Sequence, residues 1–310
     1  MFALPTLLLL GNLGAANLVP NGDFEEGLAH WGTLWTREPG VGQVALDAQV
    51  RHGGKNSARI EHRGERDWSF DPQVRVQVRP GDLFELQVWV RIEGQGRATL
   101  CVVTYEEKGQ VLQWVFAGRS VGRTRGWHRL RSRFVVPRNV AALHPRLIGG
   151  GPATVWLDDF SLVKEGNVME MRRPGMPEQL TISNATLSVT LHTADGTLLV
   201  RDRRTGQTWE QRPLVQDVVL MSAEKTAANR VEMSLLHAPS GLEVKAVLQL
   251  DGDRPYRLPD GTEVAPRGFR ITAPPRSLPP RQQTKVASTG GVQALAEPKG
   301  IFSVFFRLVL

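Results

Sequence analysis

The chain has 310 residues, 41% of them hydrophobic, which is enough apolar material for the cores of two ordinary domains. Its formal charge of +7 is spread out: residues 251–310 hold 9 basic and 5 acidic side chains, a net +4, which leaves 7 − 4 = +3 for the first 250. No recognition-helix pattern or metal-finger spacing accompanies this charge, so no nucleic-acid partner is expected.

Residues 1–16 read as a signal peptide, which would place the protein outside the cell or on its surface. The apolar segment is too short to span a bilayer, and Gly14 and Ala16 suit a peptidase site before Asn17. No Lys or Arg precedes Arg37, so the basic start of such a peptide is missing, and a buried N-terminal strand is the alternative. No later segment is long and apolar enough for a membrane span.

Alternation of apolar and polar residues, bounded by turn residues, predicts an all-β fold. Two adjacent strands are expected at residues 74–78 and 84–92, on either side of the turn at 80–82. Further strand-like runs at 98–105, 111–116, 127–136 and 154–163 have the spacing of a β-sandwich. The single cysteine, Cys101, excludes an intrachain disulfide, and its place in a strand predicts a buried thiol rather than a nucleophile.

Four motifs in the first half of the chain carry a family resemblance. They are the opening segment 17–27 (NLVPNGDFEEG) followed by Trp31, the turn 78–82 (VRPGD), Gly126 with Trp127, and the closing segment 155–162 (VWLDDFSL). In this order they resemble the family 4/9/22 carbohydrate-binding modules. The resemblance implies a galactose-binding-like jelly-roll β-sandwich over residues 17–165, with a polysaccharide as its partner.

The same resemblance implies a structural calcium ion where the two ends of the domain meet. The matching positions are Glu25, the carbonyl region from Gly53 to Asn56, and Asp158 or Asp159. Oxygen ligands from separate segments suit a hard cation that accepts irregular coordination. The alternative is that Glu25 is a turn residue and the Asp pair is solvated.

Sugar recognition combines aromatic faces with polar side chains that bind hydroxyl groups. Trp89 shares the polar register of its strand with Glu85, Gln87 and Arg91, so it is expected to point away from the apolar face. The residues expected to share its surface are Gln73, Arg75 and Gln77, together with Arg129, Arg131 and Arg133 if their strand lies in the same sheet. An outward row of arginines is also compatible with a simple solvated face.

Other aromatic residues divide into stacking candidates and packing candidates. Trp68, in an expected loop, and Trp114 with Tyr105 are the further candidates for stacking on sugar, whereas Trp31, Trp127 and Trp156 are expected to pack in the core. Core packing is the alternative for every tryptophan, because this residue is highly buried on average.

A linker at 166–178 is expected to precede a second β domain at 179–250. Within it, the strand 231–235 is expected to pair through the turn 238–241 with the strand 242–248 in an antiparallel meander. The stretch 180–210, including LVRDRRTGQTW at 199–209, resembles the N-terminal β-sandwich that precedes the catalytic barrel in several glycosidase families. That resemblance implies scaffolding without a catalytic carboxylate.

Residues 251–310 change in character, with prolines at 274, 275, 279 and 280 and no periodicity, which predicts an irregular or disordered tail. A sharper hypothesis is a frame shift near Asp253 that ends a longer enzyme early, so that a catalytic glycosidase domain is missing from the chain.

No metalloprotease, nucleophile-elbow or phosphate-loop motif occurs, and no Asp or Glu has a motif that marks it as one of the paired carboxylates of a glycosidase. The sequence therefore predicts a secreted or cell-surface, polysaccharide-binding accessory part of a glycoside hydrolase. Catalysis by the chain itself is not expected, although paired carboxylates on glycosyl bonds are invisible to a linear search. The alternative is a surface adhesion protein that binds another protein through a flat apolar patch.

Overall fold

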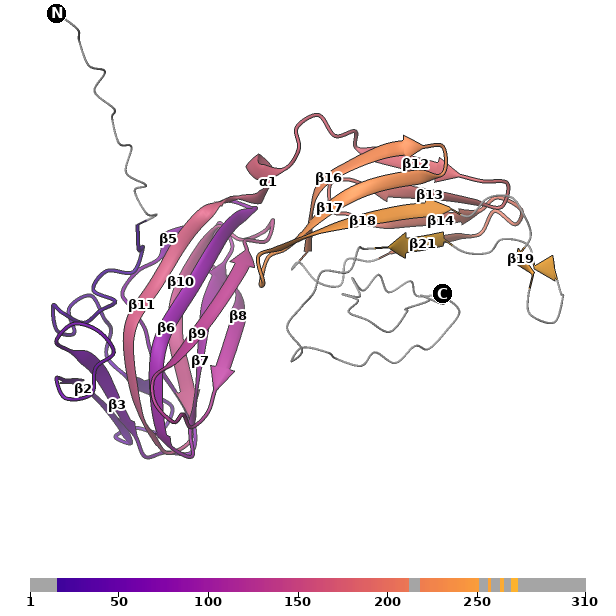
Figure 1. Cartoon of the computed structure of the whole chain (residues 1–310). Helices are drawn as coiled ribbons and strands as arrows, with labels where there is room; N and C mark the ends of the chain where they lie inside the picture. The colour runs from indigo at the N-terminus through magenta and orange to yellow at the C-terminus, as the bar shows by residue number, and fades with distance from the viewer. Residues whose placement is uncertain (1–15, 212–217, 251–255, 258–262, 265–268, 273–310) are drawn as a thin grey trace, which may run out of the picture. The chain divides into compact units, whose positions relative to one another are not determined.

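The computed structural model describes residues 16–211, 218–250, 256–257, 263–264 and 269–272, and the chain divides into two units, Met1–Asn167 and Val168–Leu310 (Figure 1). The expected signal peptide, apart from Ala16, and most of the expected tail lie outside these residues. In the described parts the single helix is α1 (Val168–Met171). None of the described helices is long and apolar enough to cross a bilayer.

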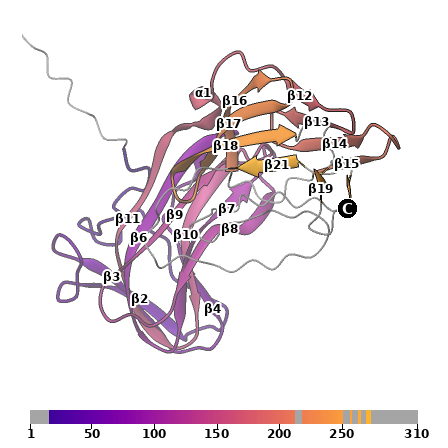
Figure 2. The same ribbon diagram turned by 45° about the vertical axis from the view of Figure 1, so that its right-hand side comes forward.

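Unit 1 is built from two antiparallel sheets, and the all-β jelly-roll sandwich predicted from the sequence is confirmed (Figure 2). The five-stranded sheet has the order β2 (Gly42–Asp47), β3 (Ser57–His62), β11 (Ala153–Asn167), β6 (Asp82–Gly94), β9 (His128–Val135). The six-stranded sheet has the order β1 (Trp35–Thr36), β4 (Asp67–Phe70), β10 (Ala142–Gly150), β7 (Arg97–Tyr105), β8 (Val111–Val121), with β5 (Val76–Gln77) also paired to β10.

The core of unit 1 fills the space between these sheets. In β6 the apolar residues from Phe84 to Ile92 are buried, while the alternating polar residues are partly exposed. This is the period-two arrangement that the sequence predicted. Trp31 packs in the same core, with its ring 4.9 Å from that of Phe70, as expected.

The expected adjacency of the strands at 74–78 and 84–92 is wrong. β5 pairs with β10 in one sheet, whereas β6 pairs with β9 and β11 in the other. The turn between them therefore crosses from one sheet to the other instead of closing a hairpin, and the Gly81 N–H bonds to the carbonyl of Val136. Alternation identifies the buried face of a strand but does not identify its neighbour.

Cys101 lies in β7 with no exposed surface, and burial raises the pKa of its thiol to about 12. The prediction of an inert buried thiol is confirmed, because the reactive species is the thiolate.

The strand β10 was not predicted from the sequence. It lies between β7 on one side and both β4 and β5 on the other, and Pro145 interrupts its strand signal. On the side that faces β4 and β5, residues 144–146 of β10 have no partner among the described strands. Pro145, which lacks an N–H group, fits at this unpaired edge.

Unit 2 contains two four-stranded antiparallel sheets that share one apolar cluster. Their orders are β12 (Gln179–Ser183), β13 (Leu187–His192), β14 (Leu198–Asp202), β15 (Thr208–Glu210), and β16 (Val218–Ala227), β17 (Arg230–His237), β18 (Leu242–Leu250), β21 (Phe269–Thr272). The predicted meander is confirmed, since Val231 lies opposite Leu248 and Leu235 opposite Val244.

The described residues beyond position 250 form short strands. β21 falls inside the stretch expected to be an irregular tail and pairs with β18, and β19 (Tyr256–Arg257) pairs with β20 (Glu263–Val264).

Candidate functional site

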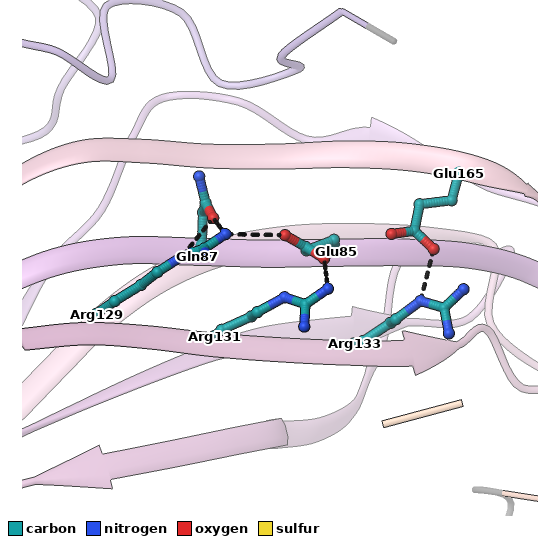
Figure 3. A network of polar contacts seen from close by, with 6 residues as sticks. All are labelled: Glu85, Gln87, Arg129, Arg131, Arg133 and Glu165. Atoms are coloured by element: carbon teal, nitrogen blue, oxygen red, sulfur yellow. Dashed lines mark hydrogen bonds and ion pairs between the residues drawn. The ribbon is translucent and has the colours of Figure 1, made fainter. Parts of the chain in front are cut away.

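The row of polar residues predicted around Trp89 forms the outer surface of the five-stranded sheet. In the β6–β9 pair, Arg129 lies opposite Trp89, Arg131 opposite Gln87 and Arg133 opposite Glu85, so the three arginines share this surface as expected (Figure 3).

These arginines are already bound by neighbouring side chains. Arg129 Nε donates to Gln87 Oε1 at 2.9 Å, Arg131 donates to Glu85, and Arg133 Nε donates to Glu165 Oε2 at 2.6 Å (Figure 3). The hydrogen bond from Arg131 lowers the pKa of Glu85, so its charge persists below the usual range of a glutamate. The row is therefore a network that joins β6, β9 and β11, rather than a line of free cations.

Trp89 is half-buried, and one face of its ring is covered by His52. The two ring centroids lie 4.0 Å apart at an interplanar angle of 16°, and Trp127 meets the same imidazole edge-on at 5.6 Å. A hollow of about 430 Å³ lies beside Trp89. Its lining includes Gln87, Asn21 and Asp159. Trp89 thus has the orientation that was predicted, with a stacking partner from its own chain.

The residues proposed to complete the Trp89 surface are not beside it. Arg75 and Gln77 belong to the segment that joins the six-stranded sheet, where Gln77 lies opposite Ala142. Gln73 bonds through its backbone N–H to the carbonyl of His30. The predicted single groove is therefore wrong, because the strand that was expected to lie next to β6 belongs to the opposite sheet.

Trp68 is also wrong as a stacking residue. It belongs to β4 instead of a loop, its side chain is 1% exposed, and it packs within the core between the two sheets. A Cβ atom on Gly149 would lie 2.2 Å from the Trp68 ring, so the indole occupies the space that a side chain at this position would need. A ring enclosed in this way cannot contact a sugar.

Trp156 and Trp127 were expected in the core, but neither belongs to the apolar cluster between the two sheets. Trp156 is 7% exposed, but its indole N–H donates to Asp47 and Arg91 lies over its ring at 5.4 Å, on the outer side of β11. Trp127 is half-buried and donates its indole N–H to the carbonyl of Arg51. Trp156 thus binds the last residue of β2, and Trp127 binds the segment that follows it.

A second polar network lies on the outer surface of the six-stranded sheet. Ser69 Oγ donates to Asp71 Oδ1 at 2.6 Å, and Arg146 donates to Ser69 Oγ at 2.7 Å. His144 Nε2 lies 3.7 Å from the other oxygen of Asp71. Arg146 Nε is buried without a hydrogen-bond acceptor among the described residues. It lies 3.6 Å from Asp71 Oδ1, so Arg146 and Asp71 form an ion pair within this network.

Aromatic rings border this network. Tyr105 lies in β7, and the guanidinium of Arg75 sits 3.9 Å from its ring centroid. Trp35 in β1 is 49% exposed and lies opposite Ser69, so it shares the outer surface of the sheet. Trp114 in β8, at the other edge of the sheet, is 64% exposed. Of the residues predicted to contact sugar, Arg75 and Trp114 are exposed in this part of the fold. Tyr105 is wrong as a stacking residue, because it is buried and Arg75 covers its ring.

Sequence reasoning missed Ser69, Asp71, His144, Arg146 and Trp35. The signal for two of them was present, because His144 and Arg146 alternate with Leu143 and Leu147, which are fully buried. Pro145 between them concealed the strand. Trp35 stands in a strand of only two residues, which is too short to show any periodicity.

The three segments named for calcium contact one another where the ends of unit 1 meet, because residues 52–56 bond to both Asp158 and Glu25. Asn17 binds the closing strand, donating to the carbonyl of Phe160 at 3.0 Å. A bulge in β11 between Asp158 and Ser161 places Asp159 in a left-handed conformation with φ of 49°. Its carboxylate lies 2.6 Å from His52 Nδ1. A Cβ atom on Gly53 would lie 3.3 Å from the Asp159 carboxylate. A Cβ atom on Gly54 would lie 2.4 Å from the Glu25 carboxylate.

The carboxylates of Asp158 and Glu25 are the main candidate ligands for a calcium ion at this place. Asp158 is fully buried, and burial raises its pKa although it accepts the N–H groups of His52 and Gly53. Glu25 Oε1 accepts the N–H groups of Lys55 and Asn56, which lower its pKa. Among the described residues no three His, Cys, Asp or Glu side chains converge at metal-ligand spacing. Calcium binds oxygen ligands of this type, but these carboxylates already accept backbone N–H groups or contact His52, so further oxygen ligands from the backbone and Asn56 would be needed to complete a site.

Residues 16–154 match the family model described as a carbohydrate binding domain. Residues 16–154 are therefore a carbohydrate-binding domain. The match ends inside β11, so it includes the polar network of the six-stranded sheet but neither Glu165 of the arginine row nor unit 2. No curated protein matches the chain.

Solved structures similar to this carbohydrate-binding domain include three with low identity. The enzymatically active domain of tailspike protein 4 of bacteriophage CBA120 is 13% identical to this chain, with a TM-score of 0.41. The match covers 48% of this chain and 21% of the tailspike domain, so this chain spans about a fifth of that protein's length. A family 16 carbohydrate-binding module is 17% identical (TM-score 0.37; 47% and 99% covered). The C-terminal family 22 module of Clostridium thermocellum Xyn10B is also 17% identical (TM-score 0.37; 50% and 98% covered).

Proposed function

We propose that the carbohydrate-binding domain holds its polysaccharide on the outer surface of the six-stranded sheet. The observation that carries the proposal is the coincidence, on one surface, of a partly buried polar network and an exposed tryptophan. Trp35 lies next to the Ser69–Asp71–Arg146 hydrogen bonds, and Trp114 stands on the opposite edge strand. Aromatic platforms with convergent polar groups between them match the two faces of a sugar ring, one apolar and one rich in hydroxyl groups.

Each group on this surface has a role that follows from its chemistry. The carboxylate of Asp71 accepts hydrogen bonds from sugar hydroxyl groups, and the guanidinium of Arg146 donates to them. His144 is held in position by the carbonyl of Val74, 2.8 Å from its Nδ1, so its other nitrogen faces Asp71. Because these side chains are fixed by one another before a ligand arrives, little conformational entropy is lost on binding.

The chain as a whole is proposed to be the exported, accessory part of a glycoside hydrolase. The support is the family of unit 1 together with the resemblance of residues 180–210 to the β-sandwich that precedes a glycosidase barrel. Unit 2 has the two-sheet architecture that this resemblance implies, and its described residues would serve as scaffolding. Export would follow from the apolar segment at residues 1–16.

A structural calcium ion is the remaining part of the proposal. Glu25, Asn56, Asp158 and Asp159, with the carbonyl of Gly53, would hold it. The support is the fully buried Asp158 carboxylate, which makes no ion pair with a basic side chain among the described residues. An ion at this position would stabilise two neighbouring carboxylates and join the opening segment to the closing strand.

A glycan array probed with the full chain tests the central proposal. Binding to polysaccharides that is lost in the Trp35→Ala/Trp114→Ala double variant is expected. The matched control is Leu46→Ala, which removes a 43%-exposed apolar side chain from the five-stranded sheet. An array without any glycan signal, combined with capture of a protein partner through the exposed tryptophans, would replace the proposal by the adhesion alternative.

A further inference from the structure

A second hollow in the carbohydrate-binding domain lies at one end of the β6–β9 pair, on a part of the surface that the proposed glycan site does not use. It has a volume of about 580 Å³ and is lined by Arg91, Glu93, Arg123, Thr124 and Arg125. Three guanidinium groups against one carboxylate give its lining a net charge of 3 − 1 = +2. Such a lining favours an anion.

The segment that carries two of these arginines is fixed to the sheet. The backbone N–H of Thr124 donates to the carbonyl of Ile92 at 3.0 Å, and the Thr124 hydroxyl accepts the Ile92 N–H, also at 3.0 Å. This reciprocal pair ties the connection between β8 and β9 to the end of β6. Arg123 and Arg125, which flank Thr124, are therefore held beside Arg91 by the backbone.

The arginines differ in what they already bind. Arg91 donates to Glu93 at 2.6 Å and lies over the ring of Trp156 at 5.4 Å, which fixes its position. Arg123 and Arg125 are exposed, and the described residues provide neither with an ion-pair partner. Two positioned but unpaired guanidinium groups can bind a planar carboxylate or a sulfate through paired N–H donors.

The hollow also continues the arginine row of β9. Trp89 is the next outward residue of β6 after Arg91, and Arg129 of β9 lies opposite it. Arg131 and Arg133 are the next two outward residues along β9. Successive outward residues of a strand are roughly 6.6 Å apart, so these arginines are regularly spaced, but each already binds a Glu or Gln side chain. Arg129, Arg131 and Arg133 against Glu85 and Glu165 add a further 3 − 2 = +1.

We propose that this arginine hollow is a second glycan subsite, which binds the anionic groups of an acidic polysaccharide. The proposal rests on the proposed polysaccharide-binding function and names the substrate class for this surface. Uronate carboxylates and sulfate esters share the required chemistry, since both present several negatively charged oxygens to guanidinium N–H groups.

The test compares affinities of the full chain for three polymers: polygalacturonate, dextran sulfate and neutral dextran. The variant is Arg123→Gln/Arg125→Gln, which keeps the Thr124 hydrogen bonds to β6. We expect the variant to lose about ten-fold in affinity for at least one of the two anionic polymers, because two charge-assisted contacts disappear. The polymer affected distinguishes carboxylate from sulfate as the natural group, and neutral dextran serves as the background.

The matched control is Arg79→Gln/Arg138→Gln, which removes the same charge from two exposed sites at the opposite end of the β6–β9 pair. Equal losses in the two double variants, or no binding of either anionic polymer by the parent chain, would overturn the subsite. Equal binding of single-stranded DNA at the same arginines would also overturn it, since the hollow would then attract any polyanion. The Trp35→Ala/Trp114→Ala variant separates the two proposals, because it should leave the loss at Arg123 and Arg125 unchanged.

Discussion

The stack of His52 on Trp89 gives the most detailed prediction. Trp89→Ala removes a parallel ring contact at 4.0 Å and empties a half-buried site on the outer surface of β6. The stacking contact contributes about 1 kcal/mol beyond area burial. Loss of a half-buried indole costs about half of what a fully buried one does, or about 2 kcal/mol. The expected loss of stability is therefore about 3 kcal/mol, with folding retained.

Differential scanning calorimetry of the full chain measures this loss. For a domain of this size, 3 kcal/mol corresponds to roughly 6–12 °C in the melting temperature of the first unit. His52→Ala should destabilise the same unit, and a double-mutant cycle should show a coupling of about 1 kcal/mol, because the two rings contact each other directly. A glycan titration of each variant supplies the second readout.

The opposite pattern would refute the reasoning. If Trp89→Ala leaves the melting temperature unchanged but lowers glycan affinity about ten-fold, the ring is a sugar platform, and His52 is merely displaced when the ligand binds. The original sequence-based assignment of Trp89 would then be correct and the outer surface of the six-stranded sheet would lose its role.

Three further outcomes are expected. Calcium should raise the melting temperature of the first unit and a chelator should reverse it by mass action, whereas identical curves would reject the ion. Burial favours a raised pKa at Asp82, but bonds from Lys164, the Arg79 N–H and Asn167 outweigh it and lower the pKa. This stabilisation is therefore complete above the unfolded pKa of about 3.9 and lost as the pH falls through the folded value, so Asp82→Asn should flatten the acid limb of the stability curve. Cys101 should react with a thiol reagent only at the rate of unfolding, because its pKa of about 12 leaves no thiolate near neutral pH; faster labelling would show an open site.

The fold of the first unit was largely predictable because its strands bury one face. In β6 every second residue from Phe84 to Ile92 is in the core, and the alternation is visible in the sequence. Strand neighbours were less predictable. Arg129, Arg131 and Arg133 lie beside β6 as expected, but β5 belongs to the other sheet, since the same short turn can close a hairpin or connect two sheets.

The candidate site was only partly predictable because it depends on contacts between distant segments. Ser69 and Asp71 are two residues apart, but His144 is far from both in the sequence, and only the pairing of β4 with β10 brings it to them. Trp68 shows the converse, since its polar neighbours in the sequence predicted a loop while its own side chain is in the core. Burial of a single tryptophan depends on the facing sheet, which the local sequence does not specify.

The affinity of the full chain for its glycan in the Trp35→Ala and Trp114→Ala variants tests the central claim most directly. Titration calorimetry with the best polysaccharide from the array should show about a ten-fold weaker affinity for each variant, since each removes one stacking platform. Melting temperatures should be almost unchanged, because the two side chains are 49% and 64% exposed. Unchanged affinity in both variants, with Trp89→Ala abolishing binding, would contradict the assignment of the glycan to the outer surface of the six-stranded sheet.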